Sequence, residues 1–172
     1  MPRPPGRGRG GYALVNRGYP VAPEDFREQG IGTNTILVYL NKGNLVAELS
    51  RAALRDIFTG KIVNWKEVGG KDEKIVVIWG DDTPEQNRLF QTYVIGFLPI
   101  VKTAVWATDQ RDVIERVVAT PAAIGIASHV YKSARTRNPK SPFVSAKVIA
   151  ITRGAPNSES QQLLELIKSF DN

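Results

Sequence analysis

The chain has 172 residues, a hydrophobic content of 42% and a formal net charge of +6. This length suits one ordinary domain, and the lack of cysteine excludes disulfides and thiolate metal sites. No stretch approaches the roughly 20 apolar residues of a membrane helix, so the sequence predicts no membrane span.

The N-terminal residues 1–11 are rich in proline, glycine and arginine and lack the apolar stretch of a signal peptide. This composition predicts a tail that is disordered or was added by cloning. As an alternative, Arg3, Arg7 and Arg9 could attract nucleic acid through its phosphates. We favour the first interpretation and expect nucleic acid not to be a partner.

The segment after the tail contains two strand patterns separated by a loop pattern. Tyr12 to Val15 is a short apolar run that predicts a strand. Asn16 to Gly30 is polar and contains two prolines, which predicts mostly loop. Ile36 to Leu40 is almost continuously apolar, as expected of a strand covered on both faces.

A first helix is predicted to begin after Ser50, a good N-cap residue. Leu54, Ile57 and Phe58 then share one helix face, and Gly60 stands where a helix commonly ends.

Ile75 to Trp79 predicts a second strong strand, and the clearest helix start in the sequence follows it. Thr83 is the predicted N-cap, Pro84 takes the first helical position and Gln86 the third, which together form a capping box. Phe90, Val94 and Phe97 are predicted to line one side of this helix, and Gly96 and Pro99 predict that it frays or ends near there.

The next helix is predicted to begin at Thr108 or Asp109 and to end at Pro121. Its predicted buried stripe comprises Val113, Ile114, Val117 and Val118. Ala123 to Ala127 predicts a third strong strand, whose small residues imply close backbone packing.

The C-terminal part predicts one more strand and one more helix. Lys147 to Ile151 is the strand, and Ser158 with Gln161 forms a second predicted capping box. The final helix is predicted to carry Leu163, Leu166, Ile167 and Phe170.

The alternation of strands and helices predicts an α/β layer fold with a mostly parallel sheet flanked by helices. We expect residues 12–172 to form a single α/β domain. Its main lobe would span residues 33–131, and residues 143–172 would supply a returning strand and helix.

Three segments carry a family resemblance. The first, Leu49 to Trp65, contains Leu-Ser, Ile-Phe-Thr-Gly-Lys-Ile and Asn-Trp. The second, Ile75 to Val94, joins a predicted strand to a predicted helix through a polar turn. The third, Pro121 to Gly125, reads Pro-Ala-Ala-Ile-Gly. Together they resemble the substrate-binding proteins of phosphate-type ABC transporters, over roughly Asn16 to Tyr131. The resemblance implies a type II periplasmic-binding-protein fold, in which two lobes close over a ligand.

The resemblance also implies a function and its setting. It implies a non-catalytic domain that needs no cofactor, takes a small anion such as phosphate, works with an ABC permease, and lies in the periplasm or outside the cell. The family begins with a longer first lobe than this chain can supply. We therefore expect a fragment, a shortened relative, or a subunit of a homo-oligomer or larger assembly that provides the missing lobe.

The family's anion-binding turn is altered in this chain. That turn reads approximately Arg-Asp-Glu-Gly-Ser-Gly-Thr-Arg, and the corresponding residues here run from Gly80 to Asn87. Gly80 replaces the leading arginine, and Pro84-Glu85-Gln86 replaces Ser-Gly-Thr. The candidate ligand-binding residues are Trp79, Asp81, Asp82, Thr83, Glu85 and Asn87.

Two physical effects weaken anion binding at this turn. Pro84 removes one of the free N–H groups with which a helix start holds phosphate. Acids at Asp81, Asp82 and Glu85 add negative charge, and two like charges 4 Å apart repel by roughly 4 kcal/mol at an effective dielectric of ~20. The alternative is that these acids only stabilise the helix start.

Other candidate sites have simpler interpretations. His129, the only histidine, is expected to be a hydrogen-bonded structural residue. We expect no metal site, although Asp81 and Asp82 with Asp109 could hold a hard cation. No G-x-S-x-G elbow or catalytic constellation is present, so we expect no enzyme. The leading hypothesis is a solute-binding domain with an altered anion site; the alternative is a scaffold or interaction domain that has kept the fold and lost small-ligand binding.

Overall fold

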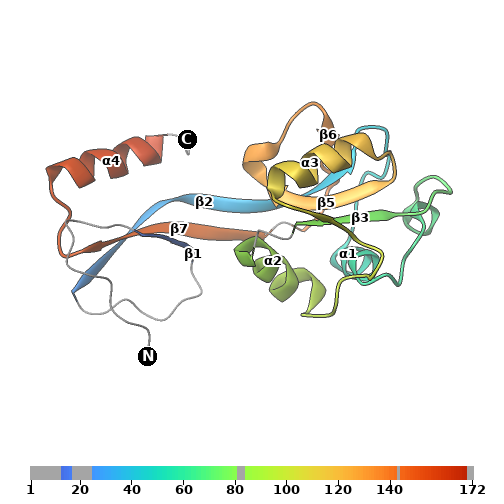
Figure 1. Ribbon diagram of the computed structural model, residues 1–172, viewed down its shortest axis with the longest axis horizontal. Coiled ribbons are helices and arrows are strands. Elements are labelled where there is room, and N and C mark those ends of the chain that lie inside the picture. The colour runs from blue at the N-terminus through green and yellow to red at the C-terminus, as the bar shows by residue number, and fades with distance from the viewer. Residues whose placement is uncertain (1–12, 17–24, 81–83, 143, 170–172) are drawn as a thin grey trace. The chain divides into compact units, whose positions relative to one another are not determined.

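The computed structural model describes residues 13–16, 25–80, 84–142 and 144–169 (Figure 1). The chain forms two compact units, one of residues 1–34 with 146–172 and the other of residues 35–145. It passes from one unit to the other twice, within strand β2 (Phe26–Asn41) and within strand β7 (Val144–Arg153). Among the described helices, none is long and apolar enough to cross a lipid bilayer.

The first unit is a small layer of strands and one helix. Strand β1 (Ala13–Asn16) pairs antiparallel with β7, and β7 lies beside β2 in the sheet. Helix α4 (Ser158–Ser169) contributes Leu164 to a core that also contains Ile31 and Ala150. An ion pair of 3.0 Å joins Arg153 Nε to the Asp25 carboxylate.

Two predictions in this unit are wrong. Strand β2 already begins at Phe26, within the segment predicted to be loop. Its first residues are largely polar and exposed, so hydrogen bonding to a neighbouring strand, rather than an apolar pattern, makes them a strand. Helix α4 is capped by Asn157, whose Oδ1 accepts a 2.8 Å hydrogen bond from Ser160 N, whereas the predicted cap, Ser158, is the first helical residue.

The second unit is built on a sheet with a parallel centre. Strand β3 (Val76–Gly80) pairs in parallel with β4 (Val105–Ala107) on one side and with β5 (Ala123–Ser128) on the other. Strand β2 joins β5 antiparallel, and the two-residue strand β6 (Thr136–Arg137) joins β2. The predicted α/β class, with helices flanking the sheet, is confirmed.

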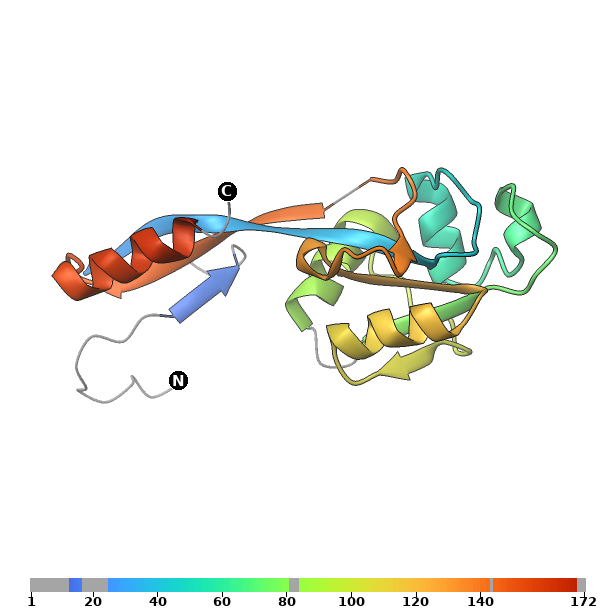
Figure 2. The same ribbon diagram turned by 90° about the horizontal axis from the view of Figure 1, so that it is seen from above.

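Helices cover both faces of the β3–β5 pair (Figures 1 and 2). Helices α1 (Arg51–Phe58) and α2 (Pro84–Phe90) pack on one face, and α3 (Gln110–Ala119) packs on the other. Successive side chains of a strand point to opposite faces. Accordingly Trp79 joins the α1–α2 core and its neighbour Ile78 joins the α3 core.

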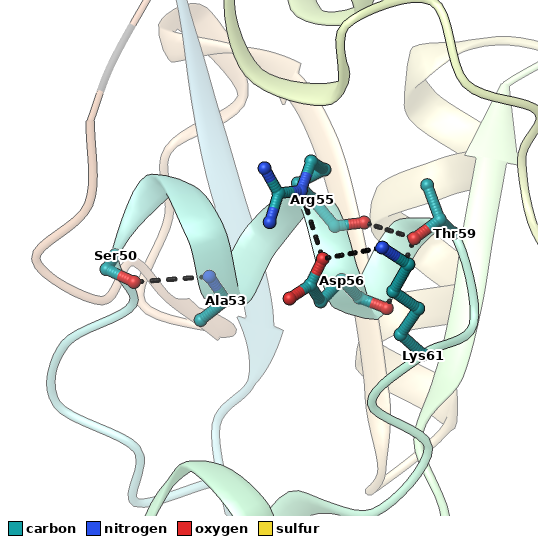
Figure 3. Close-up of polar contacts among 6 residues, drawn as sticks. All are labelled: Ser50, Ala53, Arg55, Asp56, Thr59 and Lys61. Atoms are coloured by element: carbon teal, nitrogen blue, oxygen red, sulfur yellow. Dashed lines mark hydrogen bonds and ion pairs between the residues drawn. The ribbon is translucent and has the colours of Figure 1, made fainter.

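Helix α1 begins and ends as predicted (Figure 3). Ser50 Oγ accepts a 3.1 Å hydrogen bond from Ala53 N, and Gly60 follows the helix with a positive φ of 82°. On the exposed surface, Asp56 lies 3.0 Å from Arg55 Nε and 3.9 Å from Lys61 Nζ. The hydrogen bond from Arg55 lowers the pKa of Asp56.

Helix α2 does not continue regularly to Phe97. After Phe90 the chain forms a π-helix (Gln91–Ile95), in which Gly96 N donates to Gln91 O at 2.7 Å. Gly96 and Phe97 then both take left-handed conformations, with φ values of 75° and 59°. Phe90 and Val94 are buried whereas Phe97 is 66% exposed, so its predicted place on their side of the helix is wrong: the wider turn and the left-handed pair move it off that face.

Helix α3 begins at the predicted cap, because Asp109 Oδ1 accepts a 2.8 Å hydrogen bond from Asp112 N. Asp112 itself accepts hydrogen bonds of 2.9 Å from Thr108 N and from Arg116 Nε. Both hydrogen bonds lower the pKa of Asp112 below its ordinary value of 3.8, and the bond from Thr108 N has the larger effect.

Asp112→Asn should therefore destabilise the fold at neutral pH and much less in acid. Because the pKa of Asp112 is lower in the folded state than in the unfolded state, its ionised carboxylate stabilises the fold at pH values above the ordinary pKa. This stabilisation is lost as the pH falls through the lowered pKa of the folded state. Urea midpoints of the variant and the wild type should differ at pH 7 and converge as the pH falls below 3.8. A constant difference down to pH 2 would contradict this role.

Candidate functional site

The candidate site lies at the carboxyl edge of the parallel strands. Strands β3 and β5 are paired in parallel and end at Gly80 and Ser128, so both carboxyl ends lie at the same edge of the sheet. The strand order also reverses here, since β4 lies on one side of β3 while β5 returns to the other. Open α/β sheets bind ligands outside this edge at such a reversal.

Asn87 fixes the helix that follows β3. Its Nδ2 donates a 2.7 Å hydrogen bond to Gly80 O, which joins the first turns of α2 to the end of the strand. Pro84 is the first residue of α2, as predicted, and it has no N–H to offer a ligand. This side chain, a predicted ligand-binding group, therefore also joins α2 to the end of β3.

Trp79 lies in the core beneath this turn. It is 3% exposed, and its ring centroid is 5.7 Å from that of Phe58 and 6.4 Å from that of Phe90. These edge-on and tilted contacts pack α1 and α2 onto the sheet. The structure thus gives Trp79 a packing role, and a contact with ligand stays a prediction.

Four other predicted site residues are not placed. Asp81, Asp82 and Thr83 lie outside the described residues, and only the backbone of Glu85 is described, within α2. Their contribution to a ligand site stays a prediction.

Gln86, which the sequence predicts only as part of a cap, is a buried residue in the first turn of α2. It is 4% exposed, and its Nε2 has no hydrogen-bond partner in the described structure. The predicted capping box pairs it with Thr83, which lies outside the described residues. An unpaired buried amide costs about 1–3 kcal/mol, so this group suits a ligand or water oxygen. No pattern in the sequence signals this burial.

Gln86→Met should raise the free energy of unfolding by about 1 kcal/mol, because it removes a buried unpaired amide at similar volume. Urea denaturation followed by circular dichroism measures the change. Gln162→Met on the exposed face of α4 is the control and should change stability by less than ~0.5 kcal/mol. A loss of stability in the Gln86 variant would show that the amide is satisfied in solution.

The neighbouring end of β5 is fixed from both sides. Ser128 N donates to Gln110 Oε1 at 2.9 Å, and the Tyr39 hydroxyl donates to Ser128 O at 2.8 Å. Burial raises the pKa of Tyr39 to about 12, so the phenol remains a donor. His129 follows directly, and its Nδ1 accepts a hydrogen bond from Thr35 N, as expected of a hydrogen-bonded histidine.

Comparison with known proteins finds a matching family and relatives of this chain. A family model described as a PBP superfamily domain matches residues 16–167. The phosphate-binding protein PstS of Bacillus subtilis (strain 168) is 38% identical over 88 residues, which make up 50% of this chain and 28% of that protein. The match thus spans little more than a quarter of the relative's length.

Two solved structures share the fold. A phosphate ABC transporter substrate-binding protein from Clostridium perfringens, with bound phosphate, superposes with a TM-score of 0.75 at 22% identity. The match covers 91% of this chain and 72% of the Clostridium protein. An ABC-type phosphate transport receptor from Vibrio cholerae superposes with a TM-score of 0.70 at 18% identity. This match covers 92% of this chain and 73% of the receptor. At these identities the likeness shows the fold alone.

Proposed function

Because the chain belongs to the PBP superfamily domain family, we propose that it is a non-catalytic solute-binding domain whose anion site differs from that of its phosphate-binding relatives. The observation that carries the proposal is the junction between β3 and α2, where Gly80 ends the strand and Pro84 begins the helix. This junction stands where the family resemblance puts the anion turn.

The junction supports only weak anion binding. A helix start holds phosphate through free backbone N–H groups, and Pro84 contributes none. Asn87 directs its amide at Gly80 O. The sequence places three acids, Asp81, Asp82 and Glu85, in the same turn, and each added negative charge repels a phosphate. We expect the dissociation constant for inorganic phosphate to exceed about 1 mM, or a binding free energy weaker than about −4 kcal/mol.

Solute binding itself is supported by the buried donor. Gln86 offers an unpaired amide at the edge where α/β sheets receive ligands. A domain that had become a pure scaffold would gain stability by losing this group. We therefore expect the domain to bind a small solute at this edge of the sheet, and to prefer a solute other than the phosphate dianion.

We also propose a partner and a cellular location for the domain. The Clostridium and Vibrio proteins are described as components of phosphate transport, which supports work with an ABC permease, in the periplasm or outside the cell. Fractionation of cells that express the full-length gene product tests this location. Recovery in the cytoplasmic fraction alone would contradict it.

A thermal-melting screen tests the solute-binding function. The chain is heated with a panel of small solutes that includes inorganic phosphate, sulfate, amino acids and sugars. A binder present at 100 times its dissociation constant adds about 2.7 kcal/mol to stability and raises the Tm. We expect one solute to raise the Tm and to be recovered unchanged in mass. Chemical conversion of that solute would indicate an enzyme, and no shift with any solute would favour the scaffold alternative.

A further inference from the structure

We propose that His129 is a ligand-contacting residue that donates a hydrogen bond from Nε2 to an oxyanion oxygen at the carboxyl edge. The inference deepens the proposed function and rests on it. His129 is the only histidine in the chain and directly follows the last residue of β5. Neither the sequence motifs nor the family turn assigns it a role.

The hydrogen bonds of the imidazole set its tautomer. Nδ1 accepts a hydrogen bond of 3.3 Å from Thr35 N. A neutral imidazole that accepts at Nδ1 must carry its proton on Nε2. The residues described in the structure provide no hydrogen bond or ion pair for Nε2. His129 therefore presents a donor whose direction is fixed by the backbone of β2.

The position of this donor suits a ligand. Ile36 of β2 pairs with Ser128 of β5 in the antiparallel ladder, so the next residues along, Thr35 and His129, face each other. At this position Thr35 N donates to the imidazole of His129 instead of to a backbone carbonyl. His129 is half-buried, and the following residue, Val130, is 70% exposed. The imidazole thus lies at the margin of the core, where one ring nitrogen is held and the other can meet a solute.

Neighbouring groups add a second donor. The hydroxyls of Thr35 and Ser145 lie 2.9 Å apart, so one donates to the other and the acceptor of that bond keeps its own hydrogen. Both hydroxyls and the imidazole are uncharged in this arrangement. Uncharged donors bind an oxyanion weakly, through hydrogen bonds worth about 0.5–1.5 kcal/mol each. We therefore expect millimolar rather than micromolar affinity for a simple oxyanion.

Nuclear magnetic resonance tests this inference directly, because a single histidine gives one set of imidazole signals. The 15N-labelled full chain is titrated with inorganic phosphate to tens of millimolar at constant pH and ionic strength. We expect the Nε2–H tautomer without phosphate and a saturable shift of the His129 Nε2 and Cε1–H signals with it. His129→Asn keeps an acceptor for Thr35 N but its shorter side chain places no donor at the Nε2 position, so its affinity should be about fivefold weaker at an unchanged Tm. His129→Gln carries an amide donor near the Nε2 position and should retain most of the affinity.

The outcomes separate this inference from the proposed function. An Nδ1–H tautomer, or saturable shifts of backbone amides near Gly80 with the His129 signals unmoved, would overturn the role of His129 and leave solute binding intact. Absence of any saturable shift would overturn oxyanion contact by His129, while the melting screen decides whether another solute binds. If the screen finds no solute, the proposed function fails, and the inference fails with it.

Discussion

Trp65→Ala should lower the free energy of unfolding by about 4 kcal/mol, the largest stability effect we expect from one substitution. Trp65 is 1% exposed and begins a 3-10 helix (Trp65–Val68). Its Nε1 donates a 2.9 Å hydrogen bond to Ala122 O, at the start of β5. Alanine would leave a large cavity and would remove one of the two hydrogen bonds to Ala122 O, which also accepts from Val76 N at 3.0 Å. Urea denaturation followed by circular dichroism gives the change without depending on indole fluorescence.

Trp106→Ala is the matched control for this prediction. Trp106 is on the edge strand β4 and is 56% exposed, so its loss should change stability by less than about 1 kcal/mol. Equal losses in the two variants would contradict the central place we give Trp65 in the α1–α2 core.

Restoring the family residues in the turn should raise phosphate affinity by about 100-fold. The variant Pro84→Ser, Glu85→Gly, Gln86→Thr returns one backbone N–H and two hydroxyls and removes one negative charge. Two regained hydrogen bonds to a charged oxygen, at about 1.5 kcal/mol each, correspond to roughly that factor. Isothermal titration calorimetry of the variant with inorganic phosphate at low salt measures it.

Glu85→Gln alone is the control for the charge component. It removes one negative charge and keeps Pro84, so we expect a gain of less than about tenfold. A triple variant that binds phosphate no better than the wild type would show that this turn is not the anion site.

The elements that sequence reasoning placed correctly are those whose signals are local. The family resemblance of the Leu49–Trp65 block is confirmed by the family match. The caps at Ser50 and Asp109 act through hydrogen bonds within three residues, so residue type and spacing suffice to predict them. The apolar runs that became the central strands are equally plain in the sequence.

The elements that it missed depend on contacts between distant segments. Val105 and Trp106 of the short strand β4 are exposed, and this strand exists because its backbone pairs with β3. The polar beginning of β2 is a strand because of its neighbour in the sheet. At the candidate site, the burial of Gln86 and the hydrogen bond between His129 and Thr35 are tertiary facts, and no spacing along the chain encodes them.

We propose that this chain is a solute-binding domain whose anion site differs from that of its phosphate-binding relatives. Isothermal titration calorimetry of the unaltered chain with inorganic phosphate at low salt tests this proposal. We expect a dissociation constant above about 1 mM, equivalent to a binding free energy weaker than about −4 kcal/mol. Saturable heat at micromolar phosphate, with a matching rise in Tm, would contradict it.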